Sequence, residues 1–214
     1  MNNLVLTASL AVSAVYLIFL CYRNASLART LIKTAATATL TLWAYVAGGP
    51  PLLVIALGLS TLGDALLGAG EKRYLLHGMA AFFAAHLAYI ALFWGLAASE
   101  RGLYILIAQI ALTVGAAAFI RSLMPYLEKS MRLPVLAYAI IILVMGNAAL
   151  RLDGALYLAA LGALAFMLSD LILSFELFRL GPDSRVRRIT SPLIWLFYYG
   201  GQALIAYTLI RHFA

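Results

Sequence analysis

The chain has 214 residues, of which 65% are hydrophobic and 11% charged, and its mean hydropathy is +0.99. Soluble domains are about half apolar and about a quarter charged. This composition therefore excludes an ordinary soluble protein and predicts an all-α, polytopic membrane protein with one helical domain, residues 1–214. The single cysteine, Cys21, excludes an internal disulfide and offers no cysteine-based metal site.

Eight apolar runs are long enough to cross a membrane, which takes about 20 mostly apolar residues. In chain order they cover residues 4–22, 29–47, 51–70, 74–98, 102–120, 133–150, 154–177 and 192–212. The polar stretches between them are too short to form a soluble domain. Met1-Asn2-Asn3 lacks the positive charge that begins a signal peptide, so the first run is expected to be a retained helix.

The basic residues lie mostly on one side of these spans. Lys and Arg favour the cytoplasmic side of a membrane protein. Only Arg101, Arg151 and Arg211 fall on the opposite side. We therefore attribute the net charge of +7 to membrane topology, expect no nucleic-acid partner, and predict a bacterial inner-membrane protein with both chain ends outside the cytoplasm. The odd-numbered loops and their flanks hold the other basic residues: Arg23, Arg29, Lys33, Lys72, Arg73, Arg121, Lys129, Arg132, Arg179, Arg185, Arg187 and Arg188.

Two aspartates interrupt apolar runs in the same way. Asp64 lies in "LSTLGDALLG" (59–68) and Asp170 in "FMLSDLILSF" (166–175), both expected in the cytoplasmic half of the membrane. An ionisable group inside a span costs roughly 2.5–3.5 kcal/mol and tends to be functional. The third and seventh spans are parallel and four spans apart, which suggests two parallel four-span repeats with a site between them.

Other polar residues are expected at a similar depth. They are candidates for binding a substrate, but each also has a structural interpretation. A lysine can extend to the lipid headgroups, a histidine or glutamine can bridge helices, and tyrosines are common at the membrane interface. The acidic residues in loops and at span ends are expected to be solvated: Glu71, Glu100, Glu128, Glu176 and Asp183. The candidates are Lys33, His86, Tyr198, Tyr199 and Gln202.

Several kinds of chemistry are poorly supported by the sequence. His77 and His86 are nine residues apart and point to opposite sides of one helix, and His212 falls at the other membrane face, so no zinc site is expected. The chain has no GxSxG elbow, and no Walker or GxGxxG phosphate loop. The expected site therefore needs no metal and no cofactor.

The two carboxyl groups are then the candidate catalytic residues. Burial favours the neutral form of a carboxyl group, and a neighbouring negative charge favours it further in one member of a pair. One aspartate can thus donate a proton while the other accepts one or stabilises a cation. Such a pair suits acid-catalysed cleavage of an ether bond through an oxocarbenium ion.

Five segments in order resemble the YhhN-like lysoplasmalogenase family of polytopic membrane hydrolases. They are "STLGDALLG" (60–68), "FFAAHLAYIALF" (82–93), "PVLAYAIII" (134–142), "LGALAFMLSDLILSFELF" (161–178) and "YYGGQALIAYTL" (198–209). The family usually has Lys-Pro near the start of the second span, where this chain has Lys33-Thr34.

This resemblance implies a substrate. Lysoplasmenylethanolamine or lysoplasmenylcholine would lose its sn-1 vinyl ether, giving a fatty aldehyde and glycerophosphoethanolamine or glycerophosphocholine. The lysophospholipid headgroup would lie at the cytoplasmic face, near Lys33, Lys72 and Arg73. The sequence leaves the oligomeric state open. It also leaves two alternative functions. One is a proton-coupled transporter of a lipid or small molecule, because transporters also use buried acids and repeats. The other is a purely structural membrane protein.

Overall fold

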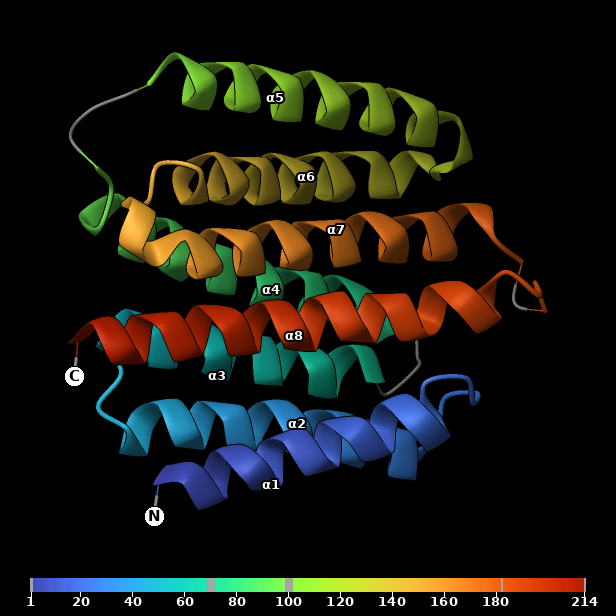
Figure 1. The fold of residues 1–214 in the computed structure, drawn as a ribbon. Helices are drawn as coiled ribbons and strands as arrows, with labels where there is room; N and C mark the ends of the chain where they lie inside the picture. The colour runs from blue at the N-terminus through green and yellow to red at the C-terminus, as the bar shows by residue number, and fades with distance from the viewer. Residues whose placement is uncertain (1, 69–71, 99–101, 182, 214) are drawn as a thin grey trace.

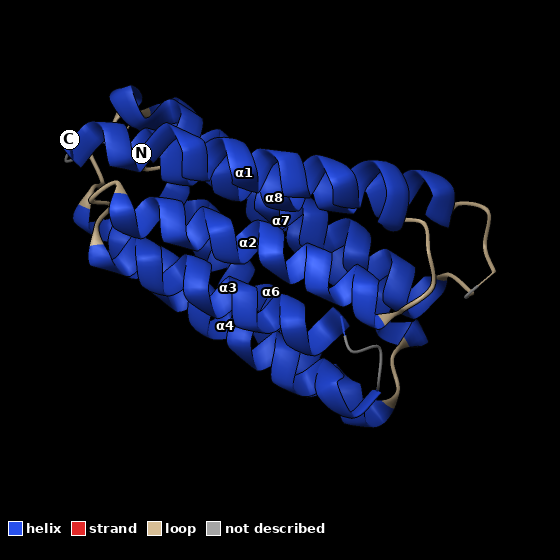
Figure 2. Cartoon of the chain, turned by 90° about the horizontal axis from the view of Figure 1, so that it is seen from below, coloured by secondary structure: helices blue, strands red, loops and turns tan. Residues whose placement is uncertain are grey.

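A computed structural model describes residues 2–68, 72–98, 102–181 and 183–213. The described residues form a helical bundle without β-strands (Figures 1 and 2). A π-helical turn, η1 (Tyr16–Leu20), continues α1. The long helices are α1 (Asn2–Val15), α2 (Leu27–Val46), α3 (Pro51–Gly68), α4 (Lys72–Gly95), α5 (Leu103–Leu123), α6 (Lys129–Ala149), α7 (Tyr157–Arg179) and α8 (Arg187–Phe213).

All eight predicted helices are present. Seven helical segments of the described chain are long and apolar enough to cross a membrane. The segment outside this set is α2, whose 20 residues include Arg29, Lys33 and five threonines. Ser26 caps α2 by accepting a hydrogen bond from the backbone N–H of Arg29, so the absence of proline after Lys33 does not disturb the helix start.

Two helices begin earlier than predicted. The sequence placed their starts at residues 133 and 192, next to Pro134 and Pro192, but α6 begins at Lys129 and α8 at Arg187. Proline is best tolerated in the first turn, where backbone N–H groups have no partner inside the helix. Here each proline lies just beyond that turn and does not end the helix.

Both chain ends lie at one end of the bundle, on the left in Figure 1. The connections that follow α1, α5 and α7 lie at the opposite end, which we call the basic end because Arg23, Arg121, Lys129 and Arg185 belong to them or their flanks. The predicted separation of the basic residues therefore matches the fold of the described chain. Arg101 lies outside the described residues, as do the side chains of Lys72 and Arg73.

The tightest helix pair is α7 with α8. A Cβ atom at Gly162 of α7 would lie 2.5 Å from the carbonyl oxygen of Gly201 on α8, and a Cβ at Gly201 would meet the carbonyl oxygen of Gly162 at the same distance. Glycine at both positions is what lets the two backbones approach so closely. This contact fixes α7, which carries Asp170, against α8, which carries Tyr198.

Helix α5 is attached much more loosely. It lies at the edge of the bundle beside α6 (Figure 1), and Leu123 near its end is its buried residue. In the first half of the chain, α2 lies against both α1 and α3. Sequential helices pack against each other in both halves, but the predicted four-plus-four repeat stays a prediction.

Candidate active site

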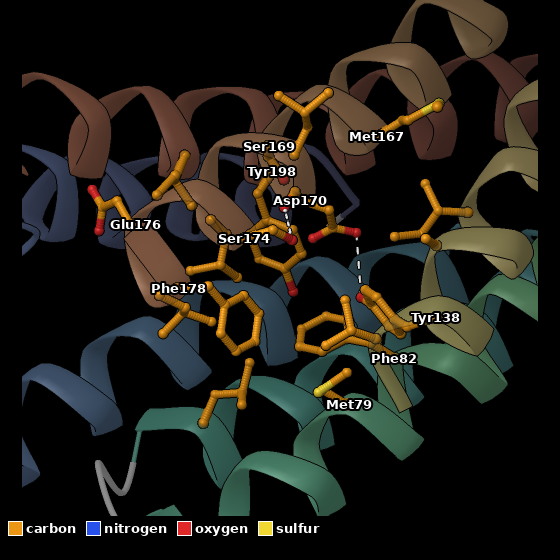
Figure 3. A pocket seen from close by; sticks show the side chains of 18 of the residues that line it. Met79, Phe82, Tyr138, Met167, Ser169, Asp170, Ser174, Glu176, Phe178 and Tyr198 are labelled. Carbon is orange, nitrogen blue, oxygen red and sulfur yellow. Dashed lines mark hydrogen bonds between the residues drawn. The ribbon is translucent and has the colours of Figure 1, made fainter. Parts of the chain in front are cut away.

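A cavity of about 660 Å³ lies between the helices and extends from the basic end toward the middle of the bundle. Residues of η1 and of α2 to α8 line it, and Figure 3 shows part of this lining from α4, α6, α7 and α8. Both Asp64 and Asp170 line it. The two acids that the sequence singled out therefore share one cavity, although they come from helices 106 positions apart in the chain.

Asp64 is completely buried and has two close partners. Lys33 Nζ lies 2.8 Å from Asp64 Oδ1, and the Tyr198 hydroxyl donates a 2.7 Å hydrogen bond to Asp64 Oδ2. The ammonium group also lies 5.6 Å from the Tyr198 ring and 5.9 Å from the Trp195 ring. A positive charge thus faces one oxygen of Asp64, and a hydroxyl donor faces the other.

Asp170 has different neighbours. The Tyr138 hydroxyl donates a hydrogen bond of 3.3 Å to Asp170 Oδ2 (Figure 3), and His86 Nε2 lies 3.6 Å from the same oxygen. His86 is fully buried, and its Nδ1 lies 2.6 Å from the carbonyl oxygen of Phe82. No lysine or arginine of the described residues forms an ion pair with Asp170. The two carboxyl groups are thus held in unlike environments.

An aromatic cluster connects the two acids' partners. Phe166 is fully buried, and its ring centroid lies 5.2 Å from that of Tyr198 and 4.9 Å from that of His86. Phe82 packs edge-on against both Phe166 and Tyr198. Such packing restricts the rotamers of the polar side chains and makes this wall of the cavity apolar.

The basic end of the cavity contains one pair that the sequence did not predict. Glu176 was expected to be solvated, but it is 4% exposed and forms an ion pair with Arg187 at 3.1 Å. Thr190 and Ser191 also donate hydrogen bonds to its carboxylate. The expectation failed because α8 begins at Arg187, whose side chain extends toward the end of α7. Its guanidinium group neutralises the Glu176 carboxylate there, so the acid can be buried. Glu71 and Glu100 lie outside the described residues.

The structure does not bring every candidate residue to the cavity. Lys33 and Tyr198 line it. His86 lies behind Asp170, Tyr199 shares a 2.6 Å hydrogen bond with Ser9, and Gln202 accepts one from Tyr89. Tyr199 and Gln202 therefore join α8 to α1 and α4 and are not among the residues that line the cavity, which favours their structural interpretation.

Other cavity residues were missed by the sequence reasoning. Tyr138 was an ordinary aromatic in an apolar run, and nothing in the pattern showed which way it faces. Tyr16 lies in η1 and is buried under the Arg29 guanidinium, 5.7 Å away. A π-helical turn often marks a functional site, but it has no clear sequence signal. Arg29 itself was counted only as a topology residue.

The fold and the cavity define an integral membrane protein with a buried, asymmetric pair of carboxyl groups. The chain belongs to the YhhN family, whose sequence profile matches residues 28–209. It is 32% identical to lysoplasmalogenase TMEM86B of Mus musculus over 208 residues, which cover 95% of this chain and 84% of that protein. The Homo sapiens protein of the same name is 33% identical over 165 residues, covering 77% and 66% of the two chains. No solved structure matches the chain significantly.

Proposed function

We propose that this protein is a lysoplasmalogenase that hydrolyses the sn-1 vinyl ether of a lysophospholipid. The observation that carries the proposal is the shared cavity of Asp64 and Asp170, in a chain that is similar to lysoplasmalogenases over most of its length. The relatives support a hydrolase of this type. The cavity supports the choice of the two aspartates as its catalytic residues, with no metal or cofactor required.

The shape of the cavity suits a lipid with one chain. Its volume falls in the usual range for small-molecule sites, about 300–1,000 Å³. Apolar residues such as Leu112, Ile142 and Met167 would contact the hydrocarbon chain, while the cations at the basic end would face the headgroup. The ether bond, which joins these two parts of the lipid, would then lie near the acids.

The unlike surroundings of the two acids suggest their roles. His86 Nδ1 contacts a carbonyl oxygen and must therefore carry a proton. In a neutral ring, Nε2 of His86 is then a hydrogen-bond acceptor. This nitrogen lies 3.6 Å from Asp170 Oδ2, and the approach of the two atoms is favourable when Asp170 carries a proton. We assign Asp170 as the general acid. Asp64, which faces Lys33 and Tyr198, is the ionised partner.

The reaction then proceeds in three steps. Asp170 protonates the alkenyl carbon that is β to the ether oxygen, and an oxocarbenium ion forms. The Asp64 carboxylate stabilises this cation and accepts a proton from the water that attacks it, giving a hemiacetal. The ionised Asp170 takes the hydroxyl proton of the hemiacetal, and Asp64 returns its proton to the glycerol oxygen. The bond between the hemiacetal carbon and the glycerol oxygen breaks, which releases the aldehyde. One water is consumed, and both acids return to their starting states.

Asparagine variants test the assignment. In detergent, the purified protein should release fatty aldehyde from lysoplasmenylethanolamine or lysoplasmenylcholine, measured by mass spectrometry. D64N and D170N should each lose at least about a hundredfold in kcat, as expected for a general acid or base. D183N is the matched control, because Asp183 is exposed in the loop before α8. Near wild-type turnover in either folded cavity variant would refute the catalytic pair.

The same assay separates a hydrolase from a carrier. Aldehyde release in detergent needs no gradient, whereas a proton-coupled transporter would move an unchanged lipid into liposomes only when a proton gradient is applied.

We further propose that the basic end faces the cytoplasm of a bacterial cell, following the preference of Lys and Arg for that side. A protease-sensitive tag after Ala214 should then be cleaved from outside the inner membrane, and protection of the tag would contradict this orientation.

A further inference from the structure

Among the residues that the structure describes, one positive charge of the cavity has no negative partner. Its lining includes three basic side chains, Arg29, Lys33 and Arg187. Lys33 is paired with Asp64, and Arg187 with Glu176. Among the described residues, no carboxylate lies within ion-pair distance of Arg29.

The environment of Arg29 also leaves its polar edge free. Its guanidinium group lies over the Tyr16 ring, and Nε is buried without a hydrogen-bond partner among the described residues. A buried donor without a partner carries a free-energy penalty that an acceptor would relieve. Because the aromatic ring takes the flat face of the guanidinium, the N–H groups at its edge remain available to an acceptor in the cavity.

We propose that Arg29 binds the phosphodiester group of the substrate at the basic end of the cavity. A guanidinium group offers paired N–H donors that match two oxygens of a phosphate. Arg29 and Lys33 are one helical turn apart, which is about 6 Å along α2. The glycerol unit separates the phosphate from the sn-1 ether oxygen by a comparable span. A phosphate at Arg29 would therefore hold the ether bond beside Lys33 and the carboxylate that this lysine contacts.

This subsite distinguishes lysophospholipids from neutral ether lipids. An alkenylglycerol has the same chain and ether bond but no phosphate, so it gains nothing from Arg29. Arg187 is less suited to this task, because Glu176 and the carbonyl oxygens of Glu176, Leu180 and Gly181 already occupy its donors. The proposal rests on the proposed function for the identity of the lipid, but not for the binding of phosphate.

Binding of uncleavable lipids tests the subsite separately from catalysis. The probes are 1-O-hexadecyl-lysophosphocholine, whose saturated ether is inert to this chemistry, and 1-O-hexadecylglycerol. Affinity is measured in detergent by titration calorimetry. Wild-type protein should bind the phospholipid at least about tenfold more tightly than the glycerol ether, and R29Q should lose that difference, since a hydrogen bond to a charged group is worth this much or more. R29K should retain part of it.

R23Q is the matched control. Arg23 lies in the loop before α2, is exposed and does not line the cavity. R23Q therefore removes one positive charge from the basic end, as R29Q does, without changing the cavity. R23Q should bind both probes as wild type does. Equal weakening of both probes by R29Q, or no weakening of either, would overturn the proposal. Inorganic phosphate that binds the wild type as tightly as the lysolipid would also overturn it, because the ligand would then be free phosphate.

Failure of the catalytic proposal would look different. If wild type and R29Q differ only toward the phosphorylated probe, but no aldehyde is ever released from a vinyl ether, the phosphate subsite stands and the hydrolase proposal falls. If aldehyde is released, R29Q should raise KM for lysoplasmenylcholine by about tenfold and leave kcat/KM for 1-O-alkenylglycerol unchanged.

Discussion

Lys33 on α2 and Asp64 on α3 form an ion pair of 2.8 Å between Nζ and Oδ1, and the carboxylate is completely shielded from solvent. The sequence left Lys33 with two interpretations, extension to the lipid headgroups or a place in the site. Its ammonium group lies in the cavity against Asp64, which favours the second interpretation. A charge buried with its partner is tolerated, whereas the same charge without its partner is strongly unfavourable.

Replacing Lys33 with methionine should therefore damage the fold more than replacing Asp64 with asparagine. K33M leaves a buried carboxylate without its counter-charge, and we expect a loss of about 3–5 kcal/mol in the free energy of unfolding. The double variant K33M/D64N should recover part of that loss, because no charge remains to be compensated. Thermal and denaturant unfolding in detergent measure both effects. K129M is the control, since Lys129 is exposed at the start of α6; equal stability of K33M and K129M would contradict this account.

Two adjacent tyrosines of α8 offer a matched comparison. Tyr198 donates a hydrogen bond to Asp64, while Tyr199 bonds to Ser9 and does not line the cavity. Y198F should lower kcat by about tenfold to a hundredfold, since a hydrogen bond to a charged group is worth about 1.5–3 kcal/mol. Y199F should cost about 1 kcal/mol of stability and leave kcat close to wild type. Steady-state kinetics with unfolding midpoints test both, and a Y199F variant that is stable but inactive would reverse the roles.

These two tyrosines also show where prediction from sequence stops. The eight helices could be predicted because the length of an apolar run decides whether it spans a membrane. The two aspartates stood out because charge inside a span is costly. Neighbouring residues of a helix point about 100° apart, however, and the sequence does not give the rotation of α8 that directs Tyr198 rather than Tyr199 to the cavity.

The partners of Tyr138 and Gln202 could not be predicted from the sequence, for related reasons. Tyr138 contacts Asp170 from α6, which is remote in the chain, so only tertiary packing reveals the pair. Gln202 is one turn after Tyr198 on the same face of α8, and the sequence therefore grouped them. One turn further along α8, the Gln202 side chain accepts a hydrogen bond from Tyr89 on α4 and does not line the cavity.

The proposed carbon protonation can be followed with deuterium. In D2O, the proton on Asp170 exchanges with solvent, and its transfer places one deuteron on the carbon next to the aldehyde carbon. Immediate reduction of the aldehyde to the alcohol prevents later exchange, and mass spectrometry counts the label. Unlabelled aldehyde incubated with D170N in D2O is the control and should gain none. A product without deuterium would exclude protonation of the alkenyl carbon as the first step.

The small residues of α5 should set the length of the chain that the cavity accepts. Gly115 lines the cavity, and a Cβ atom added there would meet no atom within 4 Å, so a larger side chain enters open space without disturbing the packing. G115L should therefore fill part of the apolar region while the fold keeps its stability. Each methylene group that no longer fits loses about 0.8 kcal/mol of burial, so long alkenyl chains should lose more kcat/KM than short ones.

Activity of G115L across a series of alkenyl chain lengths measures this shift. A118L is the matched control, because Ala118 is exposed on the same helix and does not line the cavity. It should keep the wild-type chain preference. If G115L lowers activity by the same factor at every chain length, α5 contributes to the fold but does not contact the lipid chain, and the hydrocarbon must lie elsewhere in the bundle. A selective loss on long chains would place the chain between α5 and α7, with its ether end at the two aspartates.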